Sequence, residues 1–196
     1  MIATDESVIG GRNILIQSDE KTAFDNLNVN SLIIRCHTDK DSLETLYNMF
    51  KKGVFALAFS IVGDYHLAED CVAETFIRLT QVKHFSEKKG DGKGFIYKVA
   101  RNVSLELYRK FKKNFAETNI VIQSYGETDQ KIEDCIFINQ LLKNLNEKQK
   151  QIIILKCYND LTFKEIAKIL KSPESTVKSR YQKAIEILQK KAGVNK

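Results

Sequence analysis

The stretch LTFKEIAKILKSPESTVKSRYQKA, residues 161–184, contains two helix starts about eleven residues apart. Thr162 and Glu165 form a T-x-x-E capping box, in which the hydroxyl accepts from the Glu165 N–H and the carboxylate accepts from the Thr162 N–H. Ser172 is placed to cap a second helix, and Pro173 occupies its first position, where a missing N–H costs nothing. These signals predict two short helices separated by a tight turn.

Each of these helices has one apolar face, while the second also carries basic and hydroxyl side chains. The apolar residues are Ile166, Ala167, Ile169 and Leu170 in the first helix, and Val177, Ala184 and Leu188 in the second. Two helices of this kind, with the polar face of the second turned outward, form a helix-turn-helix. This motif binds DNA by placing its second helix in the major groove.

The overall charge agrees with an anionic partner. The formal net charge of the 196-residue chain is +6 and its pI is about 9.0. Segment 98–113 holds six basic residues against one acid, and segment 164–191 holds eight against three. Two separate basic segments favour two contacts with a polyanion, whereas solvated helix faces are the alternative for either segment alone.

The chain reads as a cytoplasmic protein with reduced thiols. Its four cysteines form no C-x-x-C pair, and we expect them to act as small core residues. The N-terminus, MIATDESVIGG, lacks the features of a signal peptide, and no segment approaches the about 18 apolar residues of a membrane span. Cys36-His37 is at most half of a metal site, so we predict neither a metal nor another cofactor.

Helical periodicity prevails over strand-like alternation, which predicts an all-α protein. We expect Gly63 to end one long helix, Asp64 to cap the next, and Asn146 to form a capping box with Gln149. The expected organisation is a flexible N-terminal arm at 1–27, a helical bundle at 28–114, a flexible linker at 115–131 and a helix-turn-helix domain at 132–196. Within the bundle, a polar loop spans Lys83–Lys93 and a third long helix runs from about Gly94 to Lys113. The linker is long enough for the two small domains to move independently.

Three motifs occur in a definite order: LAEDCVAETFIRL at 67–79, GFIYKVARNVSLELYRK at 94–110, and LNEKQKQIIILKCYNDLTFKEIAKILKSPESTVKSRYQKAIEIL at 145–188. Together they resemble the bacterial sigma factors of RNA polymerase, in the small extracytoplasmic-function group that has only regions two and four. The resemblance covers about residues 28–192. It implies a protein that binds core RNA polymerase and directs promoter recognition and transcription initiation, without being an enzyme itself.

The resemblance also implies three contacts. An acidic edge would bind the clamp of the largest polymerase subunit: Glu69, Asp70 and Glu74. A basic helix side would hold the opened strand of the minus-ten element, next to a base pocket in the Lys83–Lys93 loop: Arg101, Asn102, Arg109 and Lys110. The second helix of the helix-turn-helix would read the minus-thirty-five element in promoter DNA: Glu174, Ser175, Thr176, Lys178, Ser179, Arg180 and Lys183.

The sequence departs from the family pattern at six positions. The family's glutamine is Ala73, its tryptophans are Thr80 and Phe95, its aspartate is Glu106, the common glycine of the recognition turn is Lys171, and the proline that begins region four is Asn146. Two other functions stay open: a helix-turn-helix regulator that binds a palindromic site as a dimer, and a sigma-like polymerase-binding protein without initiation activity. The resemblance also admits an anti-sigma factor as a partner.

Overall fold

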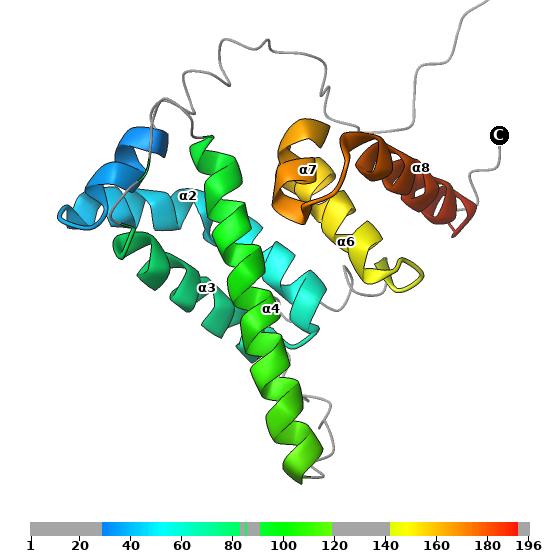
Figure 1. Ribbon diagram of the computed structural model, residues 1–196, viewed down its shortest axis with the longest axis horizontal. Coiled ribbons are helices and arrows are strands. Elements are labelled where there is room, and N and C mark those ends of the chain that lie inside the picture. Colours follow the sequence, from blue (N-terminus) through cyan, green and yellow to red (C-terminus); the bar gives the residue numbers. More distant parts are fainter. Residues whose placement is uncertain (1–28, 83–84, 86–90, 119–141, 192–196) are drawn as a thin grey trace, which may run out of the picture.

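The computed structural model describes residues 29–82, 85, 91–118 and 142–191, and every regular element in these ranges is helical. The predicted all-α class is therefore confirmed. After a short helix at 29–35, the elements are α2 (Lys40–Val62), α3 (Tyr65–Thr80), α4 (Gly92–Thr118), α6 (Glu147–Ile153), the π-helical turn η1 (Ile154–Tyr158), α7 (Phe163–Leu170) and α8 (Glu174–Lys191) (Figure 1). The expected arm at 1–27, residues 119–131 of the linker and most of the Lys83–Lys93 loop lie outside the described residues.

Local signals set both ends of α2 and the start of α3, and the roles of Gly63 and Asp64 are as predicted. Asp39 accepts a hydrogen bond from the Asp41 N–H and begins α2. Gly63 ends α2 at φ +71°, a left-handed conformation in which a Cβ would be strained. Asp64 then accepts from the Leu67 N–H at 2.8 Å and begins α3. The two helices are thereby joined by a turn of only two residues and pack side by side.

Helix α4 is longer at both ends than its pattern indicates. It begins at Gly92 and ends at Thr118, whereas the expected helix ran from about Gly94 to Lys113. At the N-terminal end, the Asp91 carboxylate accepts from the Gly94 N–H at 3.1 Å. Because this bond satisfies a free donor of the first turn, the helix tolerates Gly92 and Gly94 in that turn. The prediction that Gly92 and Lys93 lie in the loop was wrong.

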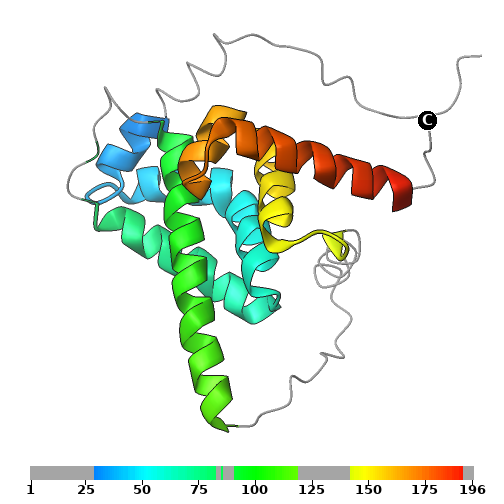
Figure 2. The same cartoon turned by 45° about the vertical axis from the view of Figure 1, so that its right-hand side comes forward.

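The first bundle consists of α2, α3 and α4, which bury one apolar stripe each. Its fully buried side chains include Leu46, Leu57, Leu79, Ile96 and Val103. In both views α4 crosses the other two helices, and its C-terminal half extends beyond them (Figures 1 and 2). The bundle therefore presents the lower part of α4 to solvent.

The second half of the chain begins at Asn146, where the predicted capping box with Gln149 is present with both bonds at 3.0 Å. Helix α6 continues into η1, and Asp160 then turns the chain at φ 51°. Helices α7 and α8 follow as the two parts of the helix-turn-helix. Leu155, Leu161 and Ile166 are fully buried beneath them.

The two halves do not stand apart. Helix α7 lies against the N-terminal half of α4, and α6 and η1 lie against α2 (Figure 2). Hydrogen bonds of side chains cross from one half to the other: Tyr97 donates to Asn159, Asn159 donates to the Gly53 carbonyl, and Arg101 donates to Gln151. The structure thus brings the two helical halves into contact, and their buried residues form one hydrophobic core.

Candidate nucleic-acid interface

The turn of the helix-turn-helix is built by local bonds at both of its ends. At the start of α7, Thr162 N–H donates to Glu165 Oε2 at 2.6 Å, and Glu165 N–H donates to Thr162 Oγ1 at 3.3 Å, which confirms the predicted capping box. At the end, Lys171 adopts the left-handed conformation at φ 50° and ψ 48°. This conformation explains why glycine suits the position, since a Cβ there is strained.

Helix α8 begins at Glu174, one residue later than predicted. The hydroxyl of Ser172 donates to the Leu170 carbonyl at 3.3 Å, and the Val177 N–H donates to the Pro173 carbonyl at 3.1 Å. Ser172 therefore bonds back toward α7, and Pro173 is the residue that directly precedes α8. The proline still lies where its missing N–H is not needed.

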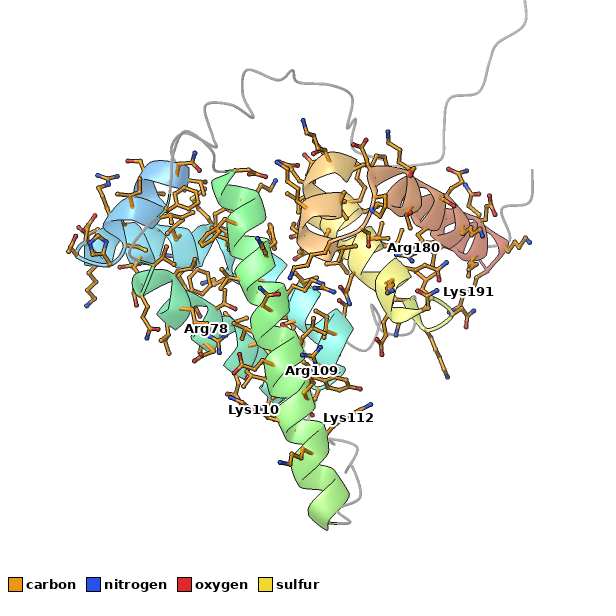
Figure 3. The ribbon with its side chains drawn as sticks, viewed as in Figure 1. Arg78, Arg109, Lys110, Lys112, Arg180 and Lys191 are labelled. Atoms are coloured by element: carbon orange, nitrogen blue, oxygen red, sulfur yellow. The ribbon has the colours of Figure 1, made fainter. Side chains whose placement is uncertain are left out.

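The predicted reading face of α8 is turned to solvent. Val177 and Ala184 are fully buried and fasten the helix to the core. The remaining candidates are exposed or half-buried: Glu174, Ser175, Thr176, Lys178, Ser179, Arg180 and Lys183. Arg180 projects from α8, well away from the basic side chains on α4 (Figure 3). The ammonium group of Lys178 is paired with Glu174 at 2.8 Å, so part of its charge is already balanced within α8.

An aromatic pair that the sequence analysis missed supports α8. The rings of Phe163 and Tyr181 meet edge to face with centroids 5.3 Å apart, and the Lys156 ammonium lies 5.4 Å from the Phe163 centroid. Tyr181 is therefore engaged in packing. Cys157 Sγ lies 3.8 Å from the Tyr181 hydroxyl and is exposed, so the prediction that all cysteines lie in the core was wrong for this residue.

The other described cysteines are buried as predicted. Cys36 and Cys71 lie in the core of the first bundle, and desolvation raises the thiol pKa of both, to about 11 for Cys71. Their thiols are therefore protonated at neutral pH. Cys135 lies outside the described residues.

The four predicted minus-ten residues do not form one surface. The Arg101 side chain is half-buried and donates from Nε to Gln151 Oε1 at 3.0 Å. Burial lowers the pKa of the Arg101 guanidinium, and the positive charge of Arg109 lowers it further. Asn102 and Arg109 are exposed. The structure thus leaves Asn102 and Arg109 open to solvent and Arg101 partly covered.

Lys110 belongs to a chain of charges on the α3 side of α4. Its ammonium lies 2.9 Å from Glu106, Glu106 lies 2.8 Å from Arg78, and Arg78 lies 2.7 Å from Glu74. The hydrogen bonds from Arg78 and Lys110 lower the pKa of Glu106 to about 2. Figure 3 shows Arg78 and Lys110 along this side of the bundle. Glutamate at position 106, in place of the family's aspartate, reaches both cations.

The three carboxylates of the predicted acidic edge on α3 have different surroundings. Glu69 and Asp70 are exposed, with Glu69 3.8 Å from His66, whereas Glu74 is bound to Arg78. Ala73 and Ile77 are exposed on the same side of the helix, and the Ile77 side chain is 51% accessible. Sequence reasoning missed Ile77, although its spacing of seven residues from Asp70 was a signal for a shared face.

Two kinds of feature are absent from the part of the chain that the structure describes. No group of three or more His, Cys, Asp or Glu side chains is arranged to hold a metal ion there. In the same ranges, no helix is long and apolar enough to cross a membrane.

Comparisons with known proteins agree with this geometry. Residues 46–114 match the family profile "Sigma-70 region 2", and residues 138–188 match "Sigma-70, region 4". The chain is similar to the ECF RNA polymerase sigma factor SigW of Bacillus subtilis, with 27% identity over 168 residues that cover 78% of this chain and 89% of SigW.

Two solved structures share the fold. One is the sigma factor RpoE in complex with the anti-sigma factor NepR from Bartonella quintana, with a TM-score of 0.65, 22% identity and coverage of 81% of this chain and 100% of that one. The other is CnrH in complex with the cytosolic domain of CnrY, with a TM-score of 0.65, 14% identity and coverage of 86% and 99%. At these identities the likeness concerns the fold alone.

Proposed function

Because the chain belongs to the extracytoplasmic-function group of RNA polymerase sigma factors, we propose that it binds core RNA polymerase and directs it to promoters through three separate surfaces. The observation that carries the proposal is that both sigma-70 regions are present, in order, on helices whose candidate contact faces are largely exposed. Bond making and breaking then belong to the polymerase, and this chain supplies recognition. Its place of action is the bacterial cytoplasm, where polymerase and promoters meet.

The minus-thirty-five element is read by α8. Its first turn and outward face offer hydroxyl, carboxylate and cationic groups, which can bond to base edges and phosphates in a major groove. Val177 and Ala184 hold the helix on the core, so its position relative to α7 is rigid. Ser175, Lys178, Ser179 and Lys183 are exposed, and the Lys178 ammonium is also paired with Glu174.

The opened minus-ten strand is held by α4. Arg101, Asn102 and Arg109 supply guanidinium and amide donors for phosphates, and Lys110 adds a cation on the neighbouring side. Backbone contacts of this kind position a single strand without reading its sequence. The base pocket that we propose for the 83–93 loop falls mostly outside the described residues.

Polymerase docking uses the exposed part of α3. The carboxylates of Glu69 and Asp70 face solvent and can pair with basic side chains of the polymerase clamp. Glu74 is already paired with Arg78, so we assign it mainly to the structure of the bundle. Because one fold neighbour is bound to the anti-sigma factor NepR, we also propose an anti-sigma factor as a regulatory partner of this chain.

Transcription in vitro tests the proposal. Added to core polymerase, the purified chain should produce defined transcripts from fragments of its own genome, and it should co-purify with the core in a stoichiometric complex. Transcripts that are identical with and without the chain would refute the function. A helix-turn-helix regulator would bind the fragments without holding the polymerase, and a non-initiating sigma-like protein would hold the polymerase without producing transcripts.

A charge-reversal experiment tests the docking surface on α3 separately and includes a control variant on α8. Glu69→Lys with Asp70→Lys should abolish co-purification, whereas Glu186→Lys, an exposed charge reversal on α8, should leave it unchanged. Equal association of the two variants would show that the α3 edge is not the docking site, while leaving the sigma function itself in place.

A further inference from the structure

The turn between α7 and α8 contains a lysine where the backbone conformation suits glycine (Figure 1). Lys171 ends α7 at φ 50° and ψ 48°, and its N–H donates to the Ala167 carbonyl. This left-handed conformation is unfavourable for a residue with a Cβ, whereas glycine adopts it freely. Strained backbone of this kind is concentrated at functional sites. The Lys171 side chain is therefore a candidate for a contact that the fold itself does not use.

The charge of Lys171 is not balanced by the residues that the structure describes. Its side chain is exposed and forms no ion pair with any of them. By contrast, Lys178 near the start of α8 is paired with Glu174 at 2.8 Å. Among the described residues, Lys171 thus carries the unpaired charge that lies nearest along the chain to the start of α8.

Helix α7 adds a second cation on the same side. Lys164 and Lys171 are seven residues apart, which is about two helical turns, and both are exposed. Glu165, the acid beside Lys164, is engaged in the capping box of α7. Lys168 lies between the two lysines, but its charge acts on the Asp91 carboxylate. Lys164 and Lys171 therefore remain as the two unpaired cations of this side.

The position of these lysines matches the edge of a major groove. In a helix-turn-helix complex, the N-terminal residues of the second helix contact base edges, and the first helix crosses the DNA backbone. The major groove is about 12 Å wide, and a helix with its side chains is about 10–12 Å in diameter. A helix in the groove fills its width, so residues just outside its first turn meet the phosphates along the rim. Lys171 precedes Glu174, where α8 begins, by at most about 11 Å of chain.

We propose that Lys171, with Lys164 as a second contact, binds phosphates of the DNA backbone beside the major groove that α8 reads. The proposal deepens the proposed function and rests on it for the DNA ligand. Glycine at position 171 would give a more stable turn without this contact, whereas lysine places a cation at the rim of the groove. Phosphate contacts carry no sequence information, so Lys171 adds affinity and fixes the orientation of α8 without selecting the bases.

Three substitutions at one position separate the charge of Lys171 from its backbone strain. Lys171→Gly removes both, Lys171→Gln removes the charge and keeps a Cβ in the left-handed turn, and Lys171→Arg keeps both. Lys148→Ala, at an exposed lysine of α6, is the matched control. Each full-length variant is combined with core polymerase. Its binding to a labelled duplex fragment that the wild-type holoenzyme transcribes is measured between about 50 and 200 mM salt, and its thermal unfolding is measured in parallel.

We expect Lys171→Gly to melt at a higher temperature than the wild type and to bind the fragment more weakly. One phosphate contact contributes about 0.9 to the slope of log K against log salt, so the slope should fall by about 0.9. The affinity at about 0.1 M salt should then fall about eightfold, if both proteins bind equally at about 1 M salt. Lys171→Gln should show the same loss of binding without the gain in Tm. Lys171→Arg and Lys148→Ala should match the wild type in binding, and adding Lys164→Ala to Lys171→Gly should lower the slope by about 0.9 again.

Loss of folded protein cannot produce this pattern, because the glycine variant is the more stable one. The proposal is overturned if Lys171→Gly and Lys171→Gln keep the wild-type affinity and salt slope, or if they weaken binding with an unchanged slope. Ethylation interference gives an independent readout. We expect a phosphate whose ethylation weakens binding by the wild type and not by Lys171→Gly, and identical interference patterns would also refute the contact. A wild-type holoenzyme that transcribes no fragment would overturn the proposed function itself, and the phosphate contact with it.

Discussion

Replacing Gly53 by alanine tests the contact between the halves with the smallest possible change. The added methyl would lie 2.3 Å from Asn159 Oδ1, 2.4 Å from the Tyr97 hydroxyl oxygen and 3.2 Å from Asn159 Cγ. Both neighbours are almost fully buried, so neither has free space in which to retreat. Alanine at a helix interior should otherwise be an improvement.

The magnitude follows from two opposing effects. Alanine gains about 0.5–1 kcal/mol over glycine from helix propensity. Overpacking a filled site costs about 1–3 kcal/mol, and displacing Tyr97 from Asn159 adds about 1 kcal/mol for the lost hydrogen bond. We therefore expect a net loss of about 1–3 kcal/mol, which corresponds to a fall in Tm of about 2–10 °C for a chain of this size.

Thermal unfolding followed by circular dichroism measures this loss, with a double-mutant cycle as its control. Tyr97→Phe removes the hydroxyl oxygen from the clash, so Gly53→Ala should cost less in the Tyr97→Phe background than in the wild type, by 0.5 kcal/mol or more. A Gly53→Ala variant that melts at or above the wild-type temperature would refute the reasoning, because helix propensity would then act unopposed.

Three other changes have expected outcomes. Lys171→Gly should raise the free energy of unfolding by about 1 kcal/mol, because Lys171 is held at φ 50°, and a lowered Tm would contradict this explanation of the turn. Asp91→Asn should stabilise the closed chain at neutral pH, since asparagine can still accept from the Gly94 N–H and can donate to Glu165 without a buried charge. The pKa of Asp91 is raised above 3.8, so the stability that Asp91 contributes is present below that pH and is lost as the pH rises through the raised pKa. The stability advantage of asparagine over aspartate should therefore shrink as the pH falls toward 3.8. An advantage that does not change with pH in chemical unfolding would contradict this cause. Arg180→Ala should weaken promoter binding by the holoenzyme and lower the salt slope by about one if Arg180 contacts a phosphate, whereas an unchanged slope with unchanged affinity would remove Arg180 from the interface.

Sequence patterns predicted the helix ends well because the interactions that form them are local. Asp64 and the capping boxes at Asn146 and Thr162 each bond to a backbone group only three residues away. Such bonds depend on few degrees of freedom, and residue type with spacing is enough to recognise them. Where local signals conflicted, as with the glycines at the start of α4, the cap at Asp91 decided the outcome and the pattern alone did not.

The grouping of the candidate site residues was less predictable. Arg101 and Lys110 share a helix and a charge, and the sequence placed them on one surface. In the structure Arg101 bonds to Gln151, 50 residues away, while Lys110 joins a chain of charges that leads to α3. Nine residues at 100° each place Lys110 on the opposite side of α4 from Arg101, so helical spacing already separates the two cations. Their partners on other helices are not encoded by that spacing.

The sequence by itself therefore determined the helices, their caps, the helix-turn-helix and the family to which the chain belongs. Only the tertiary structure decided that the two halves close on each other, that Gly53 must lack a side chain, and that Gln151 partly covers Arg101. The reason is distance along the chain: Tyr97 and Asn159 are 62 residues apart, and Asn159 and Gly53 are 106 apart. Contacts over such separations form only when several helices have packed, so they follow from the complete core and not from any single segment.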